Sequence, residues 1–386
     1  MSQDSTKAMI AEVFSDIAQG IKSGQFKKKV KIGLTILGSE HGVDEMIKAA
    51  ELARGKYDDF DIVLIGQNVE GFESIEVETA EDGHKKMVEM LESGEIDGCV
   101  TQHFDFPIGV STVGRVVTPG KGRELIIATT TGTTATNRVE GMVKNAISGI
   151  AVAKACGIKN PTVGILNLDG ARQVERILKD IQSNGYEFTF SNSLRADGGA
   201  VMRGNDLLAG TPDVMVCDSL TGNLLIKIFS SYTTGGNYEI SGSGYGPGIG
   251  EDYNKVVNIV SRASGAPLIA EALRYCATCT KNKVLDVARA EYKLANEAGL
   301  KEAIKKVTEK GNKSSAEEEV VAPPKKVVTF SIAGVDILEL DNACKCLWKQ
   351  GIYSESGMGC TGPIILVADE DGEVAKKILL EAEFMA

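Results

Sequence analysis

Histidine is scarce in this sequence, since only His41, His84 and His103 occur among its 386 residues. Histidine is a common ligand for zinc and similar metals, and a frequent acid–base catalyst. Three scattered histidines are therefore a poor basis for a multi-histidine metal centre or a histidine-rich catalytic site. We expect no metal and no other cofactor.

Long hydrophobic runs are also missing, and we expect no secretory leader. No window approaches the roughly 20 apolar residues of a membrane-spanning helix. The segment from Met1 to Lys22 has the pattern of an amphipathic helix with acidic residues, unlike a signal peptide. We therefore expect a cytoplasmic protein with no membrane partner. In that compartment cysteines are more often reduced, catalytic or metal-binding than disulfide-paired, so we expect no disulfides among the eight cysteines.

Basic residues are fewer than acidic ones. The chain has 42 Lys and Arg against 53 Asp and Glu, which gives a net charge of −11. Such a chain repels nucleic acid unless its basic residues are segregated. The one short basic run, Lys27–Lys31, leads into an apolar strand and is interpreted as a solvated strand entry. We expect no nucleic-acid partner.

Short apolar runs alternate with helical patterns from residue 29 to residue 308. Strands connected through helices pair in parallel, with helices on both faces of the sheet. We therefore predict an α/β body with a layered, mainly parallel sheet. Ligands of such folds bind at the carboxyl ends of strands. The predicted strands include residues 30–37, 61–65, 125–129, 162–166 and 214–217.

The end of the chain is predicted to form a separate module. A helix over 285–306 closes the body. Residues 309–326 are charged, contain serine and proline, and have few large apolar residues, which is typical of a flexible linker. Residues 327–386 follow as a strand, helix, glycine-rich turn, strand and helix. The predicted parts are an N-terminal helix (1–28), the body (29–308), the linker and this module.

A polar segment, Cys217-Asp218-Ser219-Leu220-Thr221-Gly222-Asn223, follows a predicted strand and opens a helix. Free amides at a helix start attract anions, and Asn223 and Lys227 share one helix face. The candidate phosphate-binding residues are therefore Asp218, Thr221, Gly222, Asn223 and Lys227. The alternative is that Asp218 or Thr221 caps the helix and that Lys227 is simply exposed.

Other segments offer groups for the same ligand. Asn137 follows a threonine-rich run at the start of a helix. It either lines the ligand-binding cleft or caps that helix. The glycine-rich residues 234–250 allow close backbone approach to a ligand, or form a surface loop. Ser261 and Arg262 supply a hydroxyl and a planar cation, which suit a phosphate or an acyl oxyanion. Alone, such a pair is more often a surface feature than a site.

Cys360 lies in the segment Gly357-Met358-Gly359-Cys360-Thr361-Gly362-Pro363. Successive free N–H groups near a thiol lower its pKa and can stabilise an oxyanion. We take Cys360 as a candidate nucleophile, and the alternative is a buried cysteine at a strand start. Cys276 and Cys279 are interpreted as structural, with redox or metal roles as alternatives. Cys344 and Cys346 are also interpreted as structural, although Cys344 could be a resolving thiol.

Residues 207–218 with Thr221-Gly222-Asn223 resemble the signature of PlsX-type acyl-acyl carrier protein:phosphate acyltransferases. Together with Gly246-Pro247 and Val260-Ser261-Arg262 they are similar to phosphate acetyltransferases. The resemblance implies an isocitrate-dehydrogenase-like fold. It also implies that Ser261 and Arg262 bind phosphate and the acyl carbonyl, with Asn223 near the same cleft. Those enzymes place an aspartate soon after the pair. Here no acid follows until Glu271, which suggests that the acyl thioester does not arrive on free coenzyme A.

The whole layout resembles the alpha subunits of component C of glycine/sarcosine/betaine reductase complexes. The resemblance implies that Cys360 carries an acetyl thioester, derived from a carboxymethylated selenocysteine on selenoprotein component A. Inorganic phosphate would then release acetyl phosphate. It further implies a thiolase-like beta subunit as partner and an oligomeric assembly. The alternatives are a PlsX-like enzyme acting on acyl carrier protein and a non-catalytic scaffold subunit.

Overall fold

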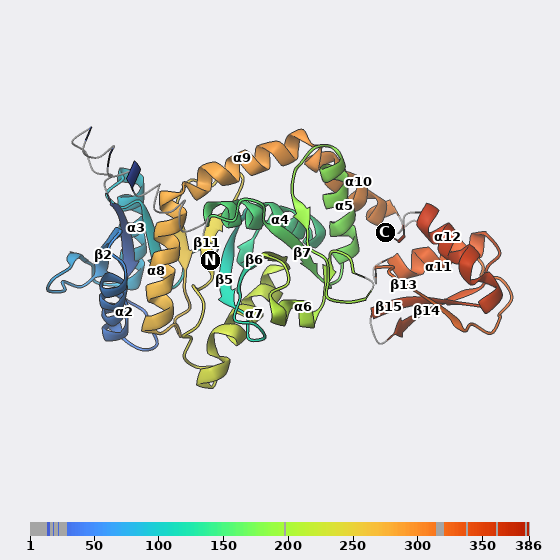
Figure 1. The fold of residues 1–386 in the computed structure, drawn as a ribbon, viewed down its shortest axis with the longest axis horizontal. Coiled ribbons are helices and arrows are strands. Elements are labelled where there is room, and N and C mark those ends of the chain that lie inside the picture. Colours follow the sequence, from blue (N-terminus) through green and yellow to red (C-terminus); the bar gives the residue numbers. More distant parts are fainter. Residues whose placement is uncertain are drawn as a thin grey trace.

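The computed structural model describes residues 14, 15, 18, 22, 29–196, 198–313, 320–336, 339–359, 362–382, 384 and 385. Figure 1 shows an elongated body with a small C-terminal module at one end. The predicted N-terminal helix (1–28) lies almost wholly outside the described residues. None of the described helices has the length and apolar character needed to cross a membrane.

Within the described residues, the body is built on one 12-stranded sheet with the order β3-β2-β1-β4-β12-β11-β5-β6-β10-β7-β8, and β9 also pairs with β7. One parallel group contains β1 (Val30–Thr35), β2 (Phe60–Gly66), β3 (Glu73–Glu76), β4 (Gly98–Thr101) and β12 (Val257–Ile259). The other contains β6 (Glu124–Thr133), β7 (Thr162–Leu166), β8 (Thr189–Phe190), β9 (Val201–Met202) and β10 (Val214–Val216). Between them lie β11 (Gly246–Ile249) and β5 (Val110–Val117).

The two parallel groups point in opposite directions. β12 is antiparallel to β11, β11 to β5, and β5 to β6, so that three reversals separate β12 from β6. The carboxyl ends of β1, β4 and β12 therefore lie at one edge of the sheet, which we name the β12 edge. Those of β6, β7 and β10 lie at the opposite edge, named the β10 edge.

Helices cover both faces of the sheet, as predicted. One buried core joins the sheet to α2 (Val43–Lys56), α4 (Arg138–Ala155), α5 (Ala171–Ser183), α8 (Ala266–Lys281), α9 (Val284–Glu297) and α10 (Leu300–Lys313). A second core joins the other face to α3 (Ala80–Ser93), α6 (Gly204–Ala209) and α7 (Ser219–Ser231). Figure 1 shows α4 and α9 on one side of the strands and α6 and α7 on the other. The predicted mainly parallel α/β body is confirmed.

Two features of the C-terminal half differ from the prediction. The single helix expected over 285–306 is two helices, α9 and α10, because the chain turns at Gly299 with φ +85°. This left-handed conformation suits glycine. α10 continues to Lys313, and so extends into the segment predicted as the linker (309–326). Residues 314–319 lie outside the described residues.

The C-terminal module contains one strand more than predicted. Its elements are β13 (Phe330–Ala333), α11 (Leu340–Lys349), β14 (Ser354–Gly359), β15 (Gly362–Val367) and α12 (Gly372–Glu381). The three strands form an antiparallel sheet with the order β13-β15-β14. β14 was missed because serine and glycine, which have weak strand preference, dominate its sequence. The glycines on either side of Cys360 thus lie in strands, Gly357 and Gly359 in β14 and Gly362 in β15.

Candidate functional site

The loop that follows β12 at the β12 edge is a compact turn. The N–H of Ser261 donates to Oγ of Ser264 at 3.0 Å, and the N–H of Ala263 donates to Oγ of Ser261 at 3.1 Å. The N–H of Ser264 returns to the carbonyl of Ser261 at 3.0 Å. We name residues 260–265 the Ser-Arg loop. It leads directly into α8, so its shape is fixed by β12 on one side and by that helix on the other.

Glu239, from the glycine-rich segment, is fastened to this loop. Its carboxylate accepts a hydrogen bond from Ser264 Oγ at 2.8 Å. Its N–H donates to the carbonyl of Ala263 at 3.0 Å, and its carbonyl accepts from the N–H of Gly265 at 2.8 Å. Glu239 is only 2% exposed. A buried carboxylate is costly unless its oxygens are paired. These contacts attach the glycine-rich segment to the Ser-Arg loop.

Lys227 and Ser261 are both linked to the Glu239 carboxylate, Lys227 directly and Ser261 through Ser264. Nζ of Lys227 lies 3.7 Å from Oε1 of Glu239, and the hydroxyl of Tyr245 donates to that oxygen at 3.4 Å. Burial, and then the nearby Glu239 carboxylate, raise the pKa of Tyr245 well above its usual value, against a lowering by its hydrogen bond with Ser261. Two candidate residues, Lys227 on α7 and Ser261 after β12, therefore lie in one network.

Arg262 is exposed and projects from the Ser-Arg loop. Its guanidinium makes no hydrogen bond or ion pair with any residue that the structure describes. Its carbonyl accepts from the N–H of Glu40 at 3.0 Å, and a ring nitrogen of His41 lies 3.2 Å from the carbonyl of Ala263. The loop between β1 and α2 thus supports the backbone of Arg262 and leaves its cation available to an anion.

The other candidates gather at the β10 edge. Asp218 caps α7, since it accepts from the N–H of Thr221 at 2.9 Å and from its hydroxyl at 3.0 Å. Arg138 donates to Asp218 at 2.7 Å. Asn137 caps α4 by accepting from the N–H of Glu140 at 3.0 Å. Burial alone would raise the pKa of Asp218, but the hydrogen bonds from Thr221 and Arg138 outweigh it and lower that pKa. These side chains serve as caps.

α7 runs from the capping residues at the β10 edge to Lys227, which lies beside Glu239. A rise of 1.5 Å per residue places Asp218 and Lys227 about 13 Å apart along its axis. Gly222 is buried against β6, where a Cβ would lie 1.7 Å from the carbonyl oxygen of Thr129. Asn223 is half-buried, one turn from Lys227 on the same face. The structure therefore links Lys227 to Ser261 through Glu239 and Ser264. It leaves Asp218, Thr221 and Asn137 at the far end of the helix.

Reasoning from sequence missed Glu239 and Tyr245. No acid was found after Arg262 before Glu271, and Glu271 is engaged by the hydroxyl of Tyr57 at 2.8 Å. The acid at the Ser-Arg loop comes from upstream instead, because Glu239 pairs with Ser264 as a parallel bridge. Its only local signal was its position inside the glycine-rich segment.

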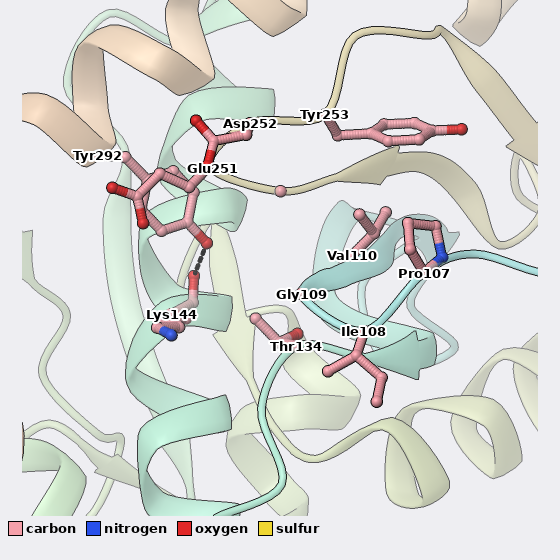
Figure 2. A pocket seen from close by; sticks show the side chains of 11 residues that line it. Pro107, Ile108, Gly109, Val110, Thr134, Lys144, Glu251, Asp252, Tyr253 and Tyr292 are labelled. Carbon is pink, nitrogen blue, oxygen red and sulfur yellow. Dashed lines mark hydrogen bonds between the residues drawn. The ribbon is translucent and has the colours of Figure 1, made fainter.

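A separate cavity of about 280 Å³ lies at the β10 edge (Figure 2). Its wall includes Thr134, Lys144 and Tyr292, and Tyr292 donates to the carbonyl of Lys144 at 3.1 Å. Thr134 donates to Asn145 at 2.6 Å. Asn145 in turn donates to the carbonyl of Cys217, just before the cap of α7, at 2.9 Å. Neither Ser261 nor Arg262 lines the cavity.

Cys360 and its neighbour Thr361 lie outside the described residues. The strands on either side are paired, with Gly359 opposite Gly362. In α8, burial raises the pKa of Cys276 to about 12, and Cys279 is also fully buried, which suits structural roles. Cys344 is buried in the module core. The described residues contain no group of three His, Cys, Asp or Glu side chains able to hold a metal ion.

Comparison with known proteins identifies the family to which this chain belongs. Residues 30–366 match the family described as "Fatty acid synthesis protein", so the chain belongs to that family. Within it, the chain is 59% identical to the glycine/sarcosine/betaine reductase complex component C subunit alpha of Peptoclostridium acidaminophilum. That match covers 98% of this chain and 99% of the relative, which confirms the predicted resemblance.

More distant relatives include phosphate acyltransferases. The enzyme of Thermotoga petrophila is 28% identical over 239 residues, which cover 52% of this chain and 67% of the relative. Among solved structures, a branched-chain phosphotransacylase from Enterococcus faecalis V583 aligns with a TM-score of 0.46 and 15% identity. That alignment covers 64% of this chain and 98% of the other.

Proposed function

We propose that this chain is a phosphate acyltransferase that forms acetyl phosphate from an acetyl thioester on Cys360. An oxygen of inorganic phosphate attacks the thioester carbonyl, the carbon–sulfur bond breaks, and the Cys360 thiolate is released. The observation that carries the proposal is the Ser-Arg loop. It presents an exposed guanidinium, with no partner among the described residues, beside a serine held in a network of buried polar groups.

The side chains at the loop suit distinct parts of this reaction. Arg262 would bind two phosphate oxygens and orient the attacking oxygen toward the carbonyl. The Ser261 hydroxyl would donate to the oxyanion that forms on the acetyl carbonyl. Lys227 would add positive charge, and its position 3.7 Å from Glu239 keeps it in the same network as Ser261. No cofactor takes part in these steps.

Membership of a larger complex is also proposed. The name of the 59% identical relative places that protein in a glycine/sarcosine/betaine reductase complex. By analogy, this chain would receive its acetyl group from the carboxymethylated selenocysteine of component A. In that step a thiol would supply the two electrons that cleave the carbon–selenium bond and would be left in a selenium–sulfur bond, and a carboxylate oxygen would leave as water when the Cys360 thioester forms. The chain would also bind the beta subunit of component C. The distant phosphate acyltransferases favour a second candidate, transfer from acyl carrier protein to phosphate. Acetyl donors and long-chain acyl donors offered in parallel would separate the two.

The test is phosphate-dependent acetyl phosphate formation by the intact complex, measured as hydroxamate. Arg262→Ala should raise the KM for phosphate about 10-fold or more, because hydrogen bonds between charged groups contribute about 1.5–3 kcal/mol each. Arg289→Ala, in an exposed position on α9, is the matched control and should leave the KM unchanged. An unaltered phosphate KM in Arg262→Ala would remove Arg262 from the phosphate site.

A further inference from the structure

Two of the three histidines meet at the β12 edge. His84, on α3, and His103, in the loop after β4, have ring centroids 6.4 Å apart. Nε2 of His84 lies 3.1 Å from the hydroxyl oxygen of Thr101, the last residue of β4. Thr101 is fully buried and accepts a hydrogen bond at 2.7 Å from the hydroxyl of Thr35, the last residue of β1. A half-buried imidazole thus lies at the carboxyl ends of two parallel strands, where ligands of α/β folds bind.

The hydrogen bonds around Thr101 determine which nitrogen of His84 carries a hydrogen. The Thr101 hydroxyl has one hydrogen, which it donates to the carbonyl of His103 at 3.3 Å. Because its oxygen accepts from Thr35, the remaining lone pair accepts from the Nε2–H group of His84. The other ring nitrogen, Nδ1, then carries no hydrogen in the neutral imidazole. Nδ1 has no hydrogen-bond partner among the described residues, so this nitrogen is available to accept a proton.

The surroundings of His84 favour its neutral form. Burial, followed by the nearby His103, lowers the pKa of His84, while Asp105 and Glu81 act in the opposite direction. His103 and Asp105 come from the loop after β4 and lie 3.3 Å apart, and Glu81 comes from α3 itself. A base must be unprotonated before it can accept a proton, so a lowered pKa keeps Nδ1 available at neutral pH.

His84 lies beside the Ser-Arg loop. β4 and β12 are parallel neighbours with Thr101 opposite Ile259, and the first N–H of the loop donates to the carbonyl of Thr101 at 2.9 Å. Ser261 follows two residues after Ile259, so its side chain emerges on the same face of the sheet as that of Thr101. Ser261 also hydrogen-bonds to Tyr245, which belongs to the same core as α3.

Strand geometry gives the separation between these groups. A rise of about 3.3 Å per residue and a spacing of about 4.8 Å between strands place the Cα atoms of Thr101 and Ser261 about 8 Å apart. His84 contacts the Thr101 side chain, and Arg262 projects from the loop next to Ser261. A phosphate ion held by the Ser-Arg loop would therefore lie near the imidazole of His84.

We propose that His84 is the general base of the acyl transfer, an inference that rests on the proposed function. HPO₄²⁻ and the acetyl thioester give the acetyl phosphate dianion and a thiol, so one proton passes from phosphate to sulfur. Nδ1 of His84 accepts this proton as the phosphate oxygen bonds to the acetyl carbon. The imidazolium then gives the proton to the sulfur of Cys360 as the carbon–sulfur bond breaks, and neutral His84 is restored.

The first test is the single-turnover rate of acetyl phosphate formation by the intact complex at saturating phosphate. His84→Gln retains an N–H group that can donate to Thr101, but it lacks a basic nitrogen. We expect the rate to fall about 100-fold or more, since general base catalysis contributes about 10²–10⁴-fold. The KM for phosphate should change far less than in Arg262→Ala. Glu89→Gln is the matched control on α3, where Glu89 is 68% exposed, and should change neither quantity.

The second test needs no acetyl group. Because the chain has only three histidines, NMR of the full chain with ring-labelled histidine gives three titrating signals, and His84→Gln identifies one of them. Saturating inorganic phosphate should raise the pKa of His84 by about 0.5 or more, because a nearby dianion favours the imidazolium. Arg262→Ala should remove this rise at the same phosphate concentration.

The outcomes separate this proposal from the proposed function. Wild-type rates in His84→Gln, or a pKa of His84 that phosphate leaves unchanged, would overturn the role of His84 while the proposed function stands. A slow His84→Gln complex without the phosphate-dependent rise in the wild-type chain would indicate a structural role, and would also overturn it. A wild-type complex that forms no acetyl phosphate would overturn the proposed function and this proposal together.

Discussion

Ser264 donates a hydrogen bond to Glu239 at 2.8 Å, and this contact joins the glycine-rich segment to the Ser-Arg loop. The same carboxylate lies 3.7 Å from Lys227 and accepts from Tyr245. One buried acid thus organises groups from three parts of the chain. Glu239 supplies the acid that the sequence lacks directly after Arg262. It precedes Arg262 in the chain and is brought to the Ser-Arg loop by the fold.

Glu239→Gln should test this organisation. The amide keeps the shape of the side chain, but it removes the negative charge that offsets Lys227 and leaves one acceptor oxygen for two donors. We expect the free energy of unfolding to fall by about 1–3 kcal/mol. We also expect the KM for phosphate to rise, because Lys227 and the loop lose their common partner.

The readouts are thermal or denaturant unfolding together with phosphate kinetics. Glu373→Gln, at an exposed position on α12, is the control and should change neither. If Glu239→Gln lowered stability with no effect on phosphate kinetics, Glu239 would support the fold alone.

Gly222 should be intolerant of a side chain. A Cβ at this position would lie 1.7 Å from the carbonyl oxygen of Thr129. Gly222→Ala should therefore force α7 away from β6 and destabilise the chain by about 1–3 kcal/mol or more, as overpacking of a close contact does. Gly55→Ala on α2 is the matched control. It meets no atom within 4 Å, and should stabilise the chain by up to about 1 kcal/mol.

Denaturant unfolding of both variants measures the difference. Equal stability of Gly222→Ala and Gly55→Ala would contradict the close packing of α7 on β6.

We expect the segment between the body and the module to limit the rate at which the acetyl group on Cys360 reaches the Ser-Arg loop. Figure 1 places the module at the far end of the molecule from α2 and α8. The ion pair between Arg176 on α5 and Glu339 at 3.2 Å contributes only about 0–1 kcal/mol. Residues 314–326 span at most about 45 Å when extended. Removal of residues 314–319 should slow the phosphate-dependent loss of acetyl from Cys360, while its loading persists.

The control for this deletion replaces residues 314–319 with six glycine and serine residues, which preserves the length. It should discharge at the wild-type rate, because a flexible linker of equal length gives a similar effective concentration. Equal rates in the shortened and wild-type chains would indicate that the linker does not limit delivery.

The local sequence predicted much of the fold and part of the site. The apolar strands and the helix caps at Asn137 and Asp218 are determined by residues close together in the sequence. Local patterns therefore predict them. The position of Glu239 beside Ser264 depends on a pairing across 25 residues, which no local pattern encodes. β14 was missed because its glycine and serine residues lack strand preference. The three antiparallel pairings that join β12, β11, β5 and β6 place the carboxyl ends of the two parallel groups at opposite edges of the sheet, which separated candidates that the sequence had placed together.

The central claim is that Cys360 carries the acetyl group that phosphate removes. The complex is supplied with carboxymethylated component A without phosphate, and peptide mass mapping locates any acetyl adduct before and after phosphate is added. The account predicts one acetyl group on the peptide that contains Cys360, which disappears on addition of phosphate as acetyl phosphate accumulates. It also predicts that Cys360→Ser gives neither adduct nor product, while Cys346→Ser gives both. Acetyl phosphate formation by Cys360→Ser at the wild-type rate would contradict it.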